Sequence, residues 1–448
     1  MKKKIISTFI CMSLVTASML TGCGGSSDKA ETAATEKKTE ASTEETKAEN
    51  EETKEATEGM EGTDADTDNK ADATGNAEEV SIWYYWEAEN HQKALDKVIQ
   101  DYNESQDEIQ VTAKYVPFAD FKKQLSIGAS ANELPDIAIL DSPDHASYAS
   151  MDIFSDLTGK FDVENYYQGA VDSCTIDGAL YGVPFGVNCL GLYYNEDMLK
   201  EANCEVPETW DELKTTAQAL TKDNVTGLAF CSLQNEEGTF NFLPWLWSTG
   251  TDSYHIDTDG GVKALTYVKD LVDSGSMSKE CINWTQGDVM NQFVSGNVAM
   301  MVNGPWQIPP MKQEAPDLNW KVTLIPKDSN YASALGGENY AVISGGNEEG
   351  ALKFLQYATN EEQVKYLMNE FGYISADKNI AATQFTDDES MKTFTEEMEY
   401  AKARGPLAEW PEVSNAISLA FNQVMTGEME PEDAAASAQA SIDSVVVK

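Results

Sequence analysis

The sequence predicts an α/β protein that is built from two lobes. The chain has 448 residues, which is more than one ordinary domain needs, and 41% of them are hydrophobic, so a large core can form. Segments with strand character alternate with segments of helical periodicity, and this pattern occurs twice along the chain. Such alternation is typical of parallel sheets that are connected by helical crossovers.

The N-terminal segment has the features of a targeting signal rather than of folded structure. Lys2, Lys3 and Lys4 precede an apolar stretch, 5–20, that is too short for an ordinary membrane-spanning helix. The stretch ends in the lipobox pattern Leu20-Thr21-Gly22-Cys23. A plain secretory signal with a chance cysteine is the alternative. We expect residues 1–22 to be a lipoprotein signal peptide and Cys23 to carry the lipid, palmitate included, that anchors the protein outside the bacterial cell membrane.

Residues 23–79 are predicted to be an acidic, disordered tether. Segment 24–79 has 18 acidic and 6 basic residues, and it contains no Val, Ile, Leu, Phe, Tyr or Trp, so it cannot form a core. A flexible chain of this length spans roughly 40 Å on average. The tether would therefore hold a folded domain away from a membrane without releasing it.

The folded part is expected to begin at Val80, where β-branched and aromatic residues start a strand. Apolar spacing and helix-start signals define the remaining elements. The expected strands are 80–86, 109–115, 135–140, 190–194, 227–230 and 298–302. The expected helices are 95–102, 120–131, one from Pro143, 209–220, 240–248, 261–272, 287–295, 351–358, 361–369, 391–401, 412–425 and 431–447.

Composition and motifs argue against several functions. The formal charge of −45 repels phosphate backbones, so we expect no nucleic-acid partner. The histidines are scattered, and the five cysteines beyond Cys23 are odd in number and contain no close pair, so we expect no metal site. The chain also lacks the known catalytic motifs, so we expect no cofactor and no enzyme activity. Whether any of these cysteines pair is left open. A glycosidase or lyase that uses Glu87 and Asp141, which both follow predicted strands, stays open as an alternative.

Aromatic residues gather where strands end or helices begin, which is where open α/β sheets bind ligands. The chain has 9 Trp, and an indole face packs well against the C–H face of a sugar ring. We expect Trp306 and Trp410 to face a ligand, and Trp83, Trp247 and Trp320 to lie in the core. For Trp86 and Trp245 the sequence leaves both roles open.

Several ordered motifs resemble those of one family, the sugar-binding proteins of bacterial ABC importers (extracellular solute-binding protein family 1, which includes maltodextrin-binding proteins). The resemblance covers the chain from Val80 to the end. The motifs are Leu134-Pro135-Asp136-Ile137, Asp177-Gly178-Ala179-Leu180-Tyr181-Gly182-Val183-Pro184-Phe185, Leu192-Tyr193-Tyr194-Asn195, Pro207-Glu208-Thr209-Trp210-Asp211-Glu212-Leu213, Gly296-Asn297-Val298-Ala299-Met300, Asn303-Gly304-Pro305-Trp306, Gly336-Gly337-Glu338-Asn339 and Ala351-Leu352-Lys353-Phe354-Leu355.

The resemblance implies a two-lobed periplasmic-binding-protein-like fold of type II, with a sheet flanked by helices in each lobe. Three crossings, expected near 183–188, 298–302 and 337–343, would act as a hinge that closes on ligand. Lobe one would comprise 80–187 plus about 300–336. Lobe two would comprise 188–299 plus about 337–448.

The resemblance also implies the function and the site. A monomer would capture a carbohydrate between its lobes and deliver it to the permease subunits of an ABC importer, and a component that delivers ligand to a sensor is the alternative. The implied ligand-binding residues are Trp86, Glu87, Asp141, Asn188, Phe240, Trp245, Trp306, Glu338, Arg404 and Trp410. The first loop reads Glu87-Ala88-Glu89-Asn90, which departs from the maltodextrin-binding pattern and argues against maltodextrin itself.

Overall fold

The computed structural model describes residues 77–446, which belong to one compact unit, Asp72–Lys448. The predicted signal peptide, Cys23 and the predicted tether up to residue 76 lie outside the described residues. Glu78 and Glu79 are already paired in the first strand, so the fold begins two residues earlier than expected. Within residues 77–446, no helix combines the length and the apolar character that crossing a membrane requires.

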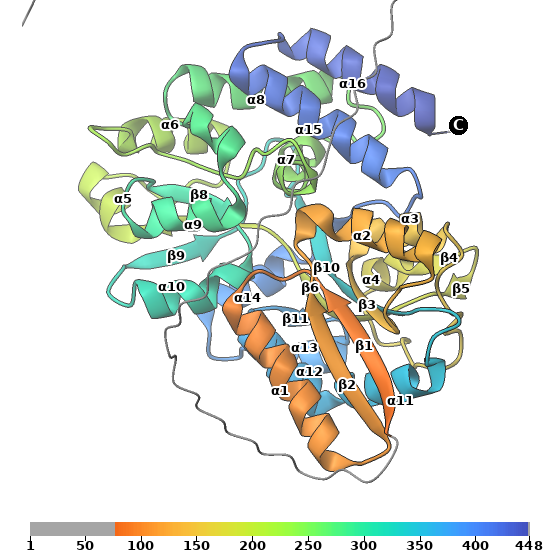
Figure 1. Cartoon of the computed structure of the whole chain (residues 1–448). Coiled ribbons are helices and arrows are strands. Elements are labelled where there is room, and N and C mark those ends of the chain that lie inside the picture. Colours follow the sequence, from red (N-terminus) through yellow and green to blue (C-terminus); the bar gives the residue numbers. More distant parts are fainter. Residues whose placement is uncertain (1–76, 447–448) are drawn as a thin grey trace, which may run out of the picture. The chain divides into compact units, whose positions relative to one another are not determined.

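The first sheet combines strands from distant parts of the sequence (Figure 1). Its order is β11-β6-β10-β3-β1-β2, and β12 pairs with β10 outside this path. The strands are β1 (Glu78–Tyr84), β2 (Ile109–Tyr115), β3 (Ile137–Asp141), β6 (Val183–Asn188), β10 (Ser333–Val342), β11 (Ile374–Ser375) and β12 (Ala401–Ala403). β1 runs parallel to β2 and β3, as the alternating pattern predicts.

The longer helices lie at the predicted positions, whereas short helices at 168–173, 196–202 and 378–381 were not expected. Several helices begin with a side-chain cap. Thr209 and Glu212, for example, form a capping box, in which each side chain accepts a bond from the other residue's backbone N–H. The helices are α1 (Glu89–Ser105), α2 (Phe118–Ala131), α3 (His145–Ala149), α4 (Gln168–Ser173), α5 (Glu196–Ala202), α6 (Trp210–Leu220), α7 (Glu236–Ser248), α8 (Asp259–Asp273), α9 (Gln286–Val294), α10 (Ile308–Glu314), α11 (Glu348–Ala358), α12 (Glu361–Phe371), α13 (Lys378–Ala381), α14 (Glu389–Glu397), α15 (Trp410–Thr426) and α16 (Pro431–Val445), with the 3₁₀ turns η1 (Ser142–Asp144), η2 (Lys279–Asn283) and η3 (Pro305–Gln307).

The second sheet is small and antiparallel, in the order β8-β7-β9. Its strands are β7 (Gly191–Asn195), β8 (Met300–Asn303) and β9 (Trp320–Thr323), and a separate hairpin joins β4 (Thr175–Ile176) to β5 (Ala179–Leu180). Helix α14 packs on β7 and β9, and α15 packs on α7, α8 and α16. The expected strand 227–230 is wrong, because Leu228 and Ala229 form only isolated bridges and no continuous ladder.

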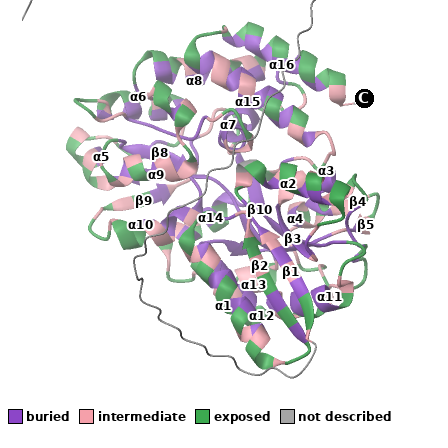
Figure 2. Cartoon of the chain, viewed as in Figure 1, coloured by how far each residue is buried: buried purple, intermediate pink, exposed green. Residues whose placement is uncertain are grey.

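Strand β10 is the longest of several strands that the sequence did not reveal, among them β6, β9 and β11. All ten residues of β10 are buried, and the strand runs antiparallel between β3 and β6 in the middle of the first sheet (Figure 2). Its Gly336-Gly337 pair suggested a hinge loop. Gly337 has a φ of 138°, and a Cβ there would lie 2.2 Å from the Gly186 carbonyl oxygen, so glycine is needed for this close approach of two strands.

Strand pairing corrects the expected division into lobes. Residues 300–303 and 320–323 pair with β7 in the second sheet, not with the first sheet as expected. Residues 338–342 pair with β3, and therefore belong to the first sheet rather than to the second lobe. The expected crossings at 298–302 and 337–343 are likewise wrong, because 300–302 lie inside β8 and 337–342 inside β10. The expected crossing at 183–188 is β6, and the passage begins where this strand ends. The chain passes between the sheets after β6, between β9 and β10, and between β11 and α14.

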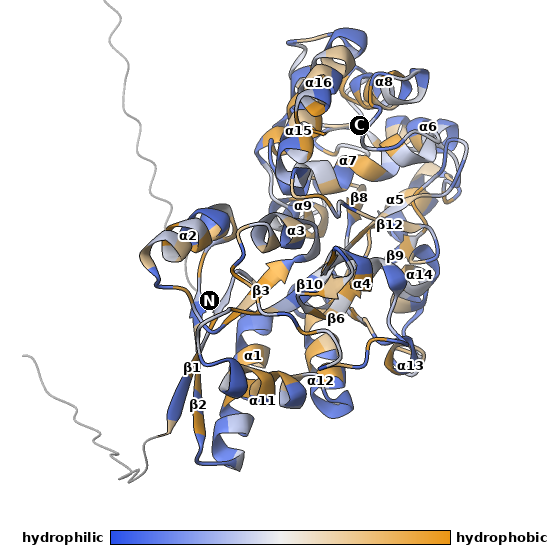
Figure 3. Cartoon of the chain, turned by 90° about the vertical axis from the view of Figure 1, so that its right-hand side faces the viewer, coloured by the Kyte–Doolittle hydropathy of each residue, from blue (hydrophilic) through white to orange (hydrophobic). Residues whose placement is uncertain are grey.

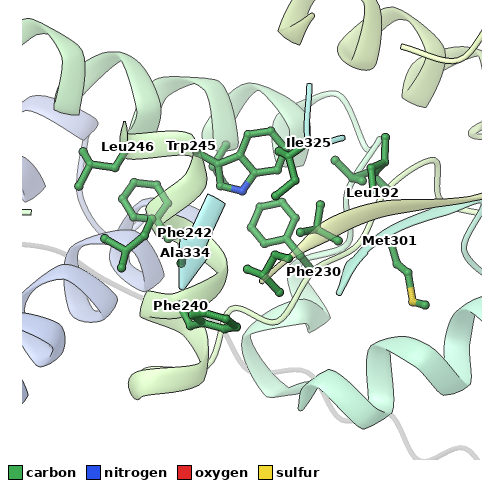
Figure 4. Packing of buried hydrophobic residues seen from close by; sticks show 14 of the residues in the cluster. Leu192, Phe230, Phe240, Phe242, Trp245, Leu246, Met301, Ile325 and Ala334 are labelled. Atoms are coloured by element: carbon green, nitrogen blue, oxygen red, sulfur yellow. The ribbon is translucent and has the colours of Figure 1, made fainter. Parts of the chain in front are cut away.

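Each sheet has its own hydrophobic core. The first sheet buries apolar strand residues such as Ile82 and Ile139 against α1, α11 and α12, and β3 is mainly hydrophobic (Figure 3). The core around the second sheet includes Phe230, Phe242 and Trp245 (Figure 4). A third cluster, which includes Phe121, Leu140 and Tyr148, also packs on the first sheet.

Candidate functional site

Polar and aromatic side chains meet at one edge of the first sheet. β1 and β3 are parallel, so their carboxyl ends lie at the same edge, and antiparallel β10 brings Glu338 opposite Asp141 there. This edge is where open α/β sheets bind ligands. Helices α7 and α15, from the part of the chain that packs with the second sheet, approach the same edge.

Glu338 is the centre of one group of side chains, which we call the Glu338 cluster: Tyr85, Trp86, Glu338 and Tyr373. Its Oε1 accepts hydrogen bonds from the Tyr85 hydroxyl at 3.1 Å, the Trp86 indole N–H at 3.3 Å and the Tyr373 hydroxyl at 3.0 Å. Only 3% of Glu338 is exposed, and its Oε2 has no partner among the described residues. This carboxyl fixes three aromatic side chains while one of its own oxygens stays unpaired.

The environment of Glu338 favours its neutral form. Burial raises its pKa to about 8, and the nearby Asp141 charge acts in the same direction, against the three hydrogen bonds that lower it. A buried carboxyl that keeps its proton near neutral pH can donate a hydrogen bond as well as accept several.

A second group, the Arg404 cluster, consists of Asp141, Glu236, Arg404, Trp410 and Ser414. The Arg404 guanidinium lies 3.1 Å from Asp141 Oδ1 and 2.5 Å from Glu236 Oε1, and all three side chains are largely buried. Glu236 also accepts bonds from the Trp410 indole N–H at 3.2 Å and from the Ser414 hydroxyl. The cluster thus links the end of β3 to the start of α7 and to α15.

Arg404 has few donors to spare. Its Nε donates to the Leu335 carbonyl at 3.2 Å, and Nη1 and Nη2 both face Asp141. The guanidinium also lies over the Phe240 ring, 4.3 Å from its centroid, which adds a cation–π contact. Burial lowers the pKa of Arg404, but the two carboxylates outweigh it and raise that pKa, so the side chain stays charged.

Trp306 lies in η3, at the start of the helical segment after β8, as its position behind Gly304-Pro305 predicts. Its ring is partly exposed, 6.1 Å from the Phe240 ring and 6.2 Å edge-on from the Tyr373 ring. A Cβ at Gly304 would collide with the Trp306 ring at 1.9 Å, so the glycine gives this ring its place. Trp306 therefore lies between Tyr373 of the Glu338 cluster and Phe240, the ring on which Arg404 rests.

Two expected ligand residues lie deeper than a ligand-stacking role requires. Trp245 has no exposed surface and packs against Phe230, at 5.4 Å between ring centroids, in the core of Figure 4. Trp410 is also fully buried, so only its indole N–H reaches the Arg404 cluster, through Glu236. The expectation of an open ring face is wrong for both, because each lies on the core side of its helix.

The remaining expected residues lie at or near the same edge. Glu87 is exposed and accepts a 3.3 Å bond from the Tyr115 hydroxyl. Asn188 is buried at the end of β6. Its side chain packs closely on Gly336 of β10, because a Cβ added to Gly336 would lie only 2.2 Å from the side-chain oxygen of Asn188. Thus Glu338, Asp141, Arg404, Phe240, Trp306 and Trp86 come together, while Trp245 stays apart in the core.

The sequence interpretation missed Glu236, Tyr85 and Tyr373. Glu236 is the first residue of α7, directly after the N-cap Asn235 whose side chain accepts from the Gly238 N–H. That N-cap could have shown that the helix begins four residues before Phe240, with an acidic residue at its start. Tyr373 follows the αL residue Gly372, but its approach to Glu338 depends on long-range pairing that no local signal predicts.

No cluster of three or more His, Cys, Asp or Glu side chains that could hold a metal ion occurs within residues 77–446. Five cysteines in this range are free, and four of them are buried. His91 and His145 are buried, which lowers the pKa of each to about 4, so both are neutral near pH 7.

The two sheets, the three passages of the chain between them and the carboxyl-edge cluster define a two-lobed periplasmic-binding-protein-like fold. A solved structure with this fold, the GacH receptor of Streptomyces glaucescens, described unliganded and with acarbose, has a TM-score of 0.74 and is 26% identical; the match covers 81% of this chain and 97% of that one. Residues 97–393 match the family model described as bacterial extracellular solute-binding protein. The chain belongs to this family of bacterial extracellular solute-binding proteins.

Curated relatives extend over most of the chain. The galactooligosaccharide-binding protein of Bacillus subtilis is 23% identical over 382 residues, which cover 82% of this chain and 89% of the relative. A maltooligosaccharide ABC transporter solute-binding lipoprotein of Streptococcus pneumoniae is 22% identical over 400 residues, covering 84% and 90%. These relatives are binding proteins, and family membership assigns the chain to the extracytoplasmic side of the cell.

Proposed function

We propose that this protein captures a carbohydrate between its two lobes and delivers it to the permease of an ABC importer. The observation that carries the proposal is the joint position of aromatic rings and hydrogen-bonding carboxyls at the carboxyl edge of the first sheet. Rings can pack on the C–H faces of a sugar while carboxyl oxygens accept from its hydroxyls. The saccharides in the names of the relatives support the same class of ligand.

The proposed ligand contacts are Trp306, Phe240, Glu338, Asp141 and Arg404, with Trp86, Glu87 and Asn188 at the margin. The proposed lobes follow the strand pairing: the first contains β1, β2, β3, β6, β10 and β11, and the second contains β7, β8 and β9. The protein acts as a monomer without a cofactor and carries out no turnover. The first loop, which departs from the maltodextrin-binding pattern, argues against maltodextrin as the ligand.

A carbohydrate panel tests the proposal. We expect at least one mono- or oligosaccharide to raise the melting temperature of the purified protein and to bind in calorimetry, while chromatography shows unchanged sugar chains after long incubation. A panel without any binding sugar would refute the carbohydrate assignment. Product release that disappears in Glu87→Gln or Asp141→Asn would instead favour the glycosidase alternative.

The lipid anchor is part of the proposal. The Leu20–Cys23 pattern and the lipoprotein relative of Streptococcus pneumoniae support Cys23 as the attachment point. We expect Cys23→Ala to move the protein from the membrane fraction to the soluble fraction, with Cys204→Ala as a control that leaves it in the membrane. If Cys23→Ala remains as firmly membrane-bound as the parent, another segment anchors the chain.

A further inference from the structure

The turn that carries Trp306 is held from the core side by one buried hydroxyl. Tyr193 lies in β7, has no exposed surface, and donates a hydrogen bond from its hydroxyl to the Gly304 carbonyl at 2.7 Å. Burial raises the pKa of Tyr193 well above its usual range, so the hydroxyl keeps its proton and remains a donor. The same carbonyl accepts the Gln307 N–H at 3.2 Å, the bond with which η3 begins. The start of the turn is therefore fixed to a strand of the second sheet.

The N–H group of Gly304 is fixed as well. It donates to the Asn303 side-chain oxygen at 3.0 Å, and the Asn303 amide in turn donates to the Gln286 carbonyl at 2.9 Å. Asn303 has no exposed surface, so water does not compete for these bonds. Both polar groups of the Gly304 backbone thus have defined partners, one from β7 and one from the end of β8.

Gly304 is also the surface on which the Trp306 ring lies. A Cβ added to Gly304 would fall 1.9 to 2.4 Å from three atoms of that ring, so the indole and the backbone are in close contact. A rotation of the Gly304 backbone would therefore move the ring. The neighbouring rings of Phe240 and Tyr373, whose centroids are 6.1 and 6.2 Å from that of Trp306, leave part of the indole exposed. The position of Gly304 thus sets where this ring lies at the ligand edge.

We propose that Tyr193 is a positioning residue of the ligand site, which holds the Trp306 ring in place for sugar stacking through its hydrogen bond to the Gly304 carbonyl. This inference rests on the proposed carbohydrate-binding function and on Trp306 as a ligand contact. The Tyr193 ring is itself enclosed in the core, with the ring centroids of Trp320 and Phe394 5.6 and 5.8 Å away. Tyr193 therefore acts on the ligand only through the turn that it supports.

Tyr193→Phe removes the hydroxyl and keeps the ring. If the loosened turn holds the indole ready for stacking in about a tenth to a third of the molecules, the apparent affinity falls by about threefold to tenfold. Calorimetry measures this with glucose, galactose, mannose and their 1,4-linked disaccharides, and the tightest-binding sugar is used for every variant.

Tyr267→Phe is the matched control. The Tyr267 hydroxyl is also buried in the core of the second sheet, and it donates a similar bond, 2.9 Å long, to the Trp210 carbonyl. We expect this variant to lose about as much stability in a thermal melt as Tyr193→Phe but to keep the parent affinity. A loss of affinity in Tyr193→Phe alone would then reflect the position of the hydroxyl and not the loss of a buried hydrogen bond as such.

Two further measurements follow the ring itself. In a Trp306→Ala background, Tyr193→Phe should weaken binding no further, because a ring that is missing cannot be misplaced. In protein that contains 5-fluorotryptophan, the Trp306 signal is the one that disappears in Trp306→Phe. Without sugar, we expect this fluorine signal to shift or broaden in Tyr193→Phe and to stay unchanged in Tyr267→Phe.

Gly304→Ala tests the same link without changing Tyr193, and it decides the question if Tyr193→Phe does not fold. Its added Cβ displaces the indole, so we expect about tenfold weaker binding. Parent affinity in folded Tyr193→Phe, Gly304→Ala or Trp306→Ala overturns this inference alone, and so does an unmoved fluorine signal or a fully additive loss in the double mutant. If none of the sugars binds the parent protein, the proposed function itself fails, and this inference with it.

Discussion

Trp306 and Trp245 show how two tryptophans in similar sequence settings come to different roles. Both follow aromatic or proline-rich segments at the start or middle of helical stretches. Trp306 keeps part of its ring exposed beside Phe240 and Tyr373, whereas Trp245 is enclosed by Phe230, Trp210 and Tyr267. Burial, and not residue type, decides which of them a ligand can reach.

The two rings therefore predict opposite effects of truncation. We expect Trp306→Ala to weaken sugar binding by about tenfold to a hundredfold, since an aromatic anchor contributes roughly 2 kcal/mol, and to leave the melting temperature almost unchanged. Calorimetry with the identified sugar and a thermal melt measure both quantities. Unchanged affinity, or a large loss of stability without ligand, would assign Trp306 to the core.

Glu338 predicts a pH dependence of stability. Its pKa is raised from 4.5 to about 8, so the free energy of unfolding that it contributes is complete below about pH 4.5 and is lost as pH rises through about 8. We expect the melting temperature to fall between about pH 6.5 and 9, a range above the charging of buried His91 and His145.

Glu338→Gln isolates this contribution, because glutamine keeps an acceptor for Tyr85, Trp86 and Tyr373 but does not ionise. In this variant the melting temperature should fall less steeply with pH than in the parent. The fall that remains reflects other carboxyls with raised pKa values, such as Asp144 and Glu236. In the control Glu164→Gln, at an exposed position, the melting temperature should fall with pH as steeply as in the parent. Parallel curves for the parent and Glu338→Gln would show that Glu338 is ionised throughout.

At the scale of elements, local signals identified most of the longer helices and the strands β1, β2, β3, β7 and β8, but not β6, β9, β10 or β11. The alternation of strand and helix predicted β1, α1, β2 and α2 with ends within a few residues, since their apolar spacing is regular. β10 was not predicted because its glycines are typical of a loop. It is a strand because its backbone pairs with β3 and β6, which lie far away in the sequence. Local patterns likewise placed Asp141 and Trp306, but not Glu236 or Tyr373.

Helix α7 gives the prediction that belongs to this scale. Its residues from Gly238 to Ser248 are buried, so the helix acts as a core element with only its start at the site. We expect Trp245→Ala to lower the free energy of unfolding by about 3–5 kcal/mol, as large-to-small changes in a core do. Trp245→Phe should cost less, because the indole N–H has no partner to lose. Chemical denaturation measures both; a neutral Trp245→Ala would contradict the core assignment.

At the scale of the whole molecule, the Arg404 cluster joins segments that pack with different sheets. Asp141 ends a strand of the first sheet, and Glu236 begins a helix that packs with the second sheet's core. A charged link between two lobes resists their separation, while three short passages of chain permit hinge motion. The balance of these two features sets how far the lobes open without ligand.

Solution scattering tests this balance. We expect the radius of gyration to fall when the ligand saturates the protein. We also expect ligand-free Asp141→Asn to have a larger radius than the parent, because the ion pair with Arg404 is weakened. Exposed Asp107→Asn serves as the control that leaves the radius unchanged. The same radius with and without ligand would indicate a rigid site.

The placement of β10 also governs the order in which the molecule can be built. β3 and β6 must wait for a strand that lies some 150 to 200 residues further along the chain, and β11 joins β6 later still. Closing such long loops has an entropic cost that slows folding. The first lobe therefore stays incomplete until most of the polypeptide has emerged from the ribosome. For a chain that begins with a predicted export signal, late completion favours translocation before the fold closes.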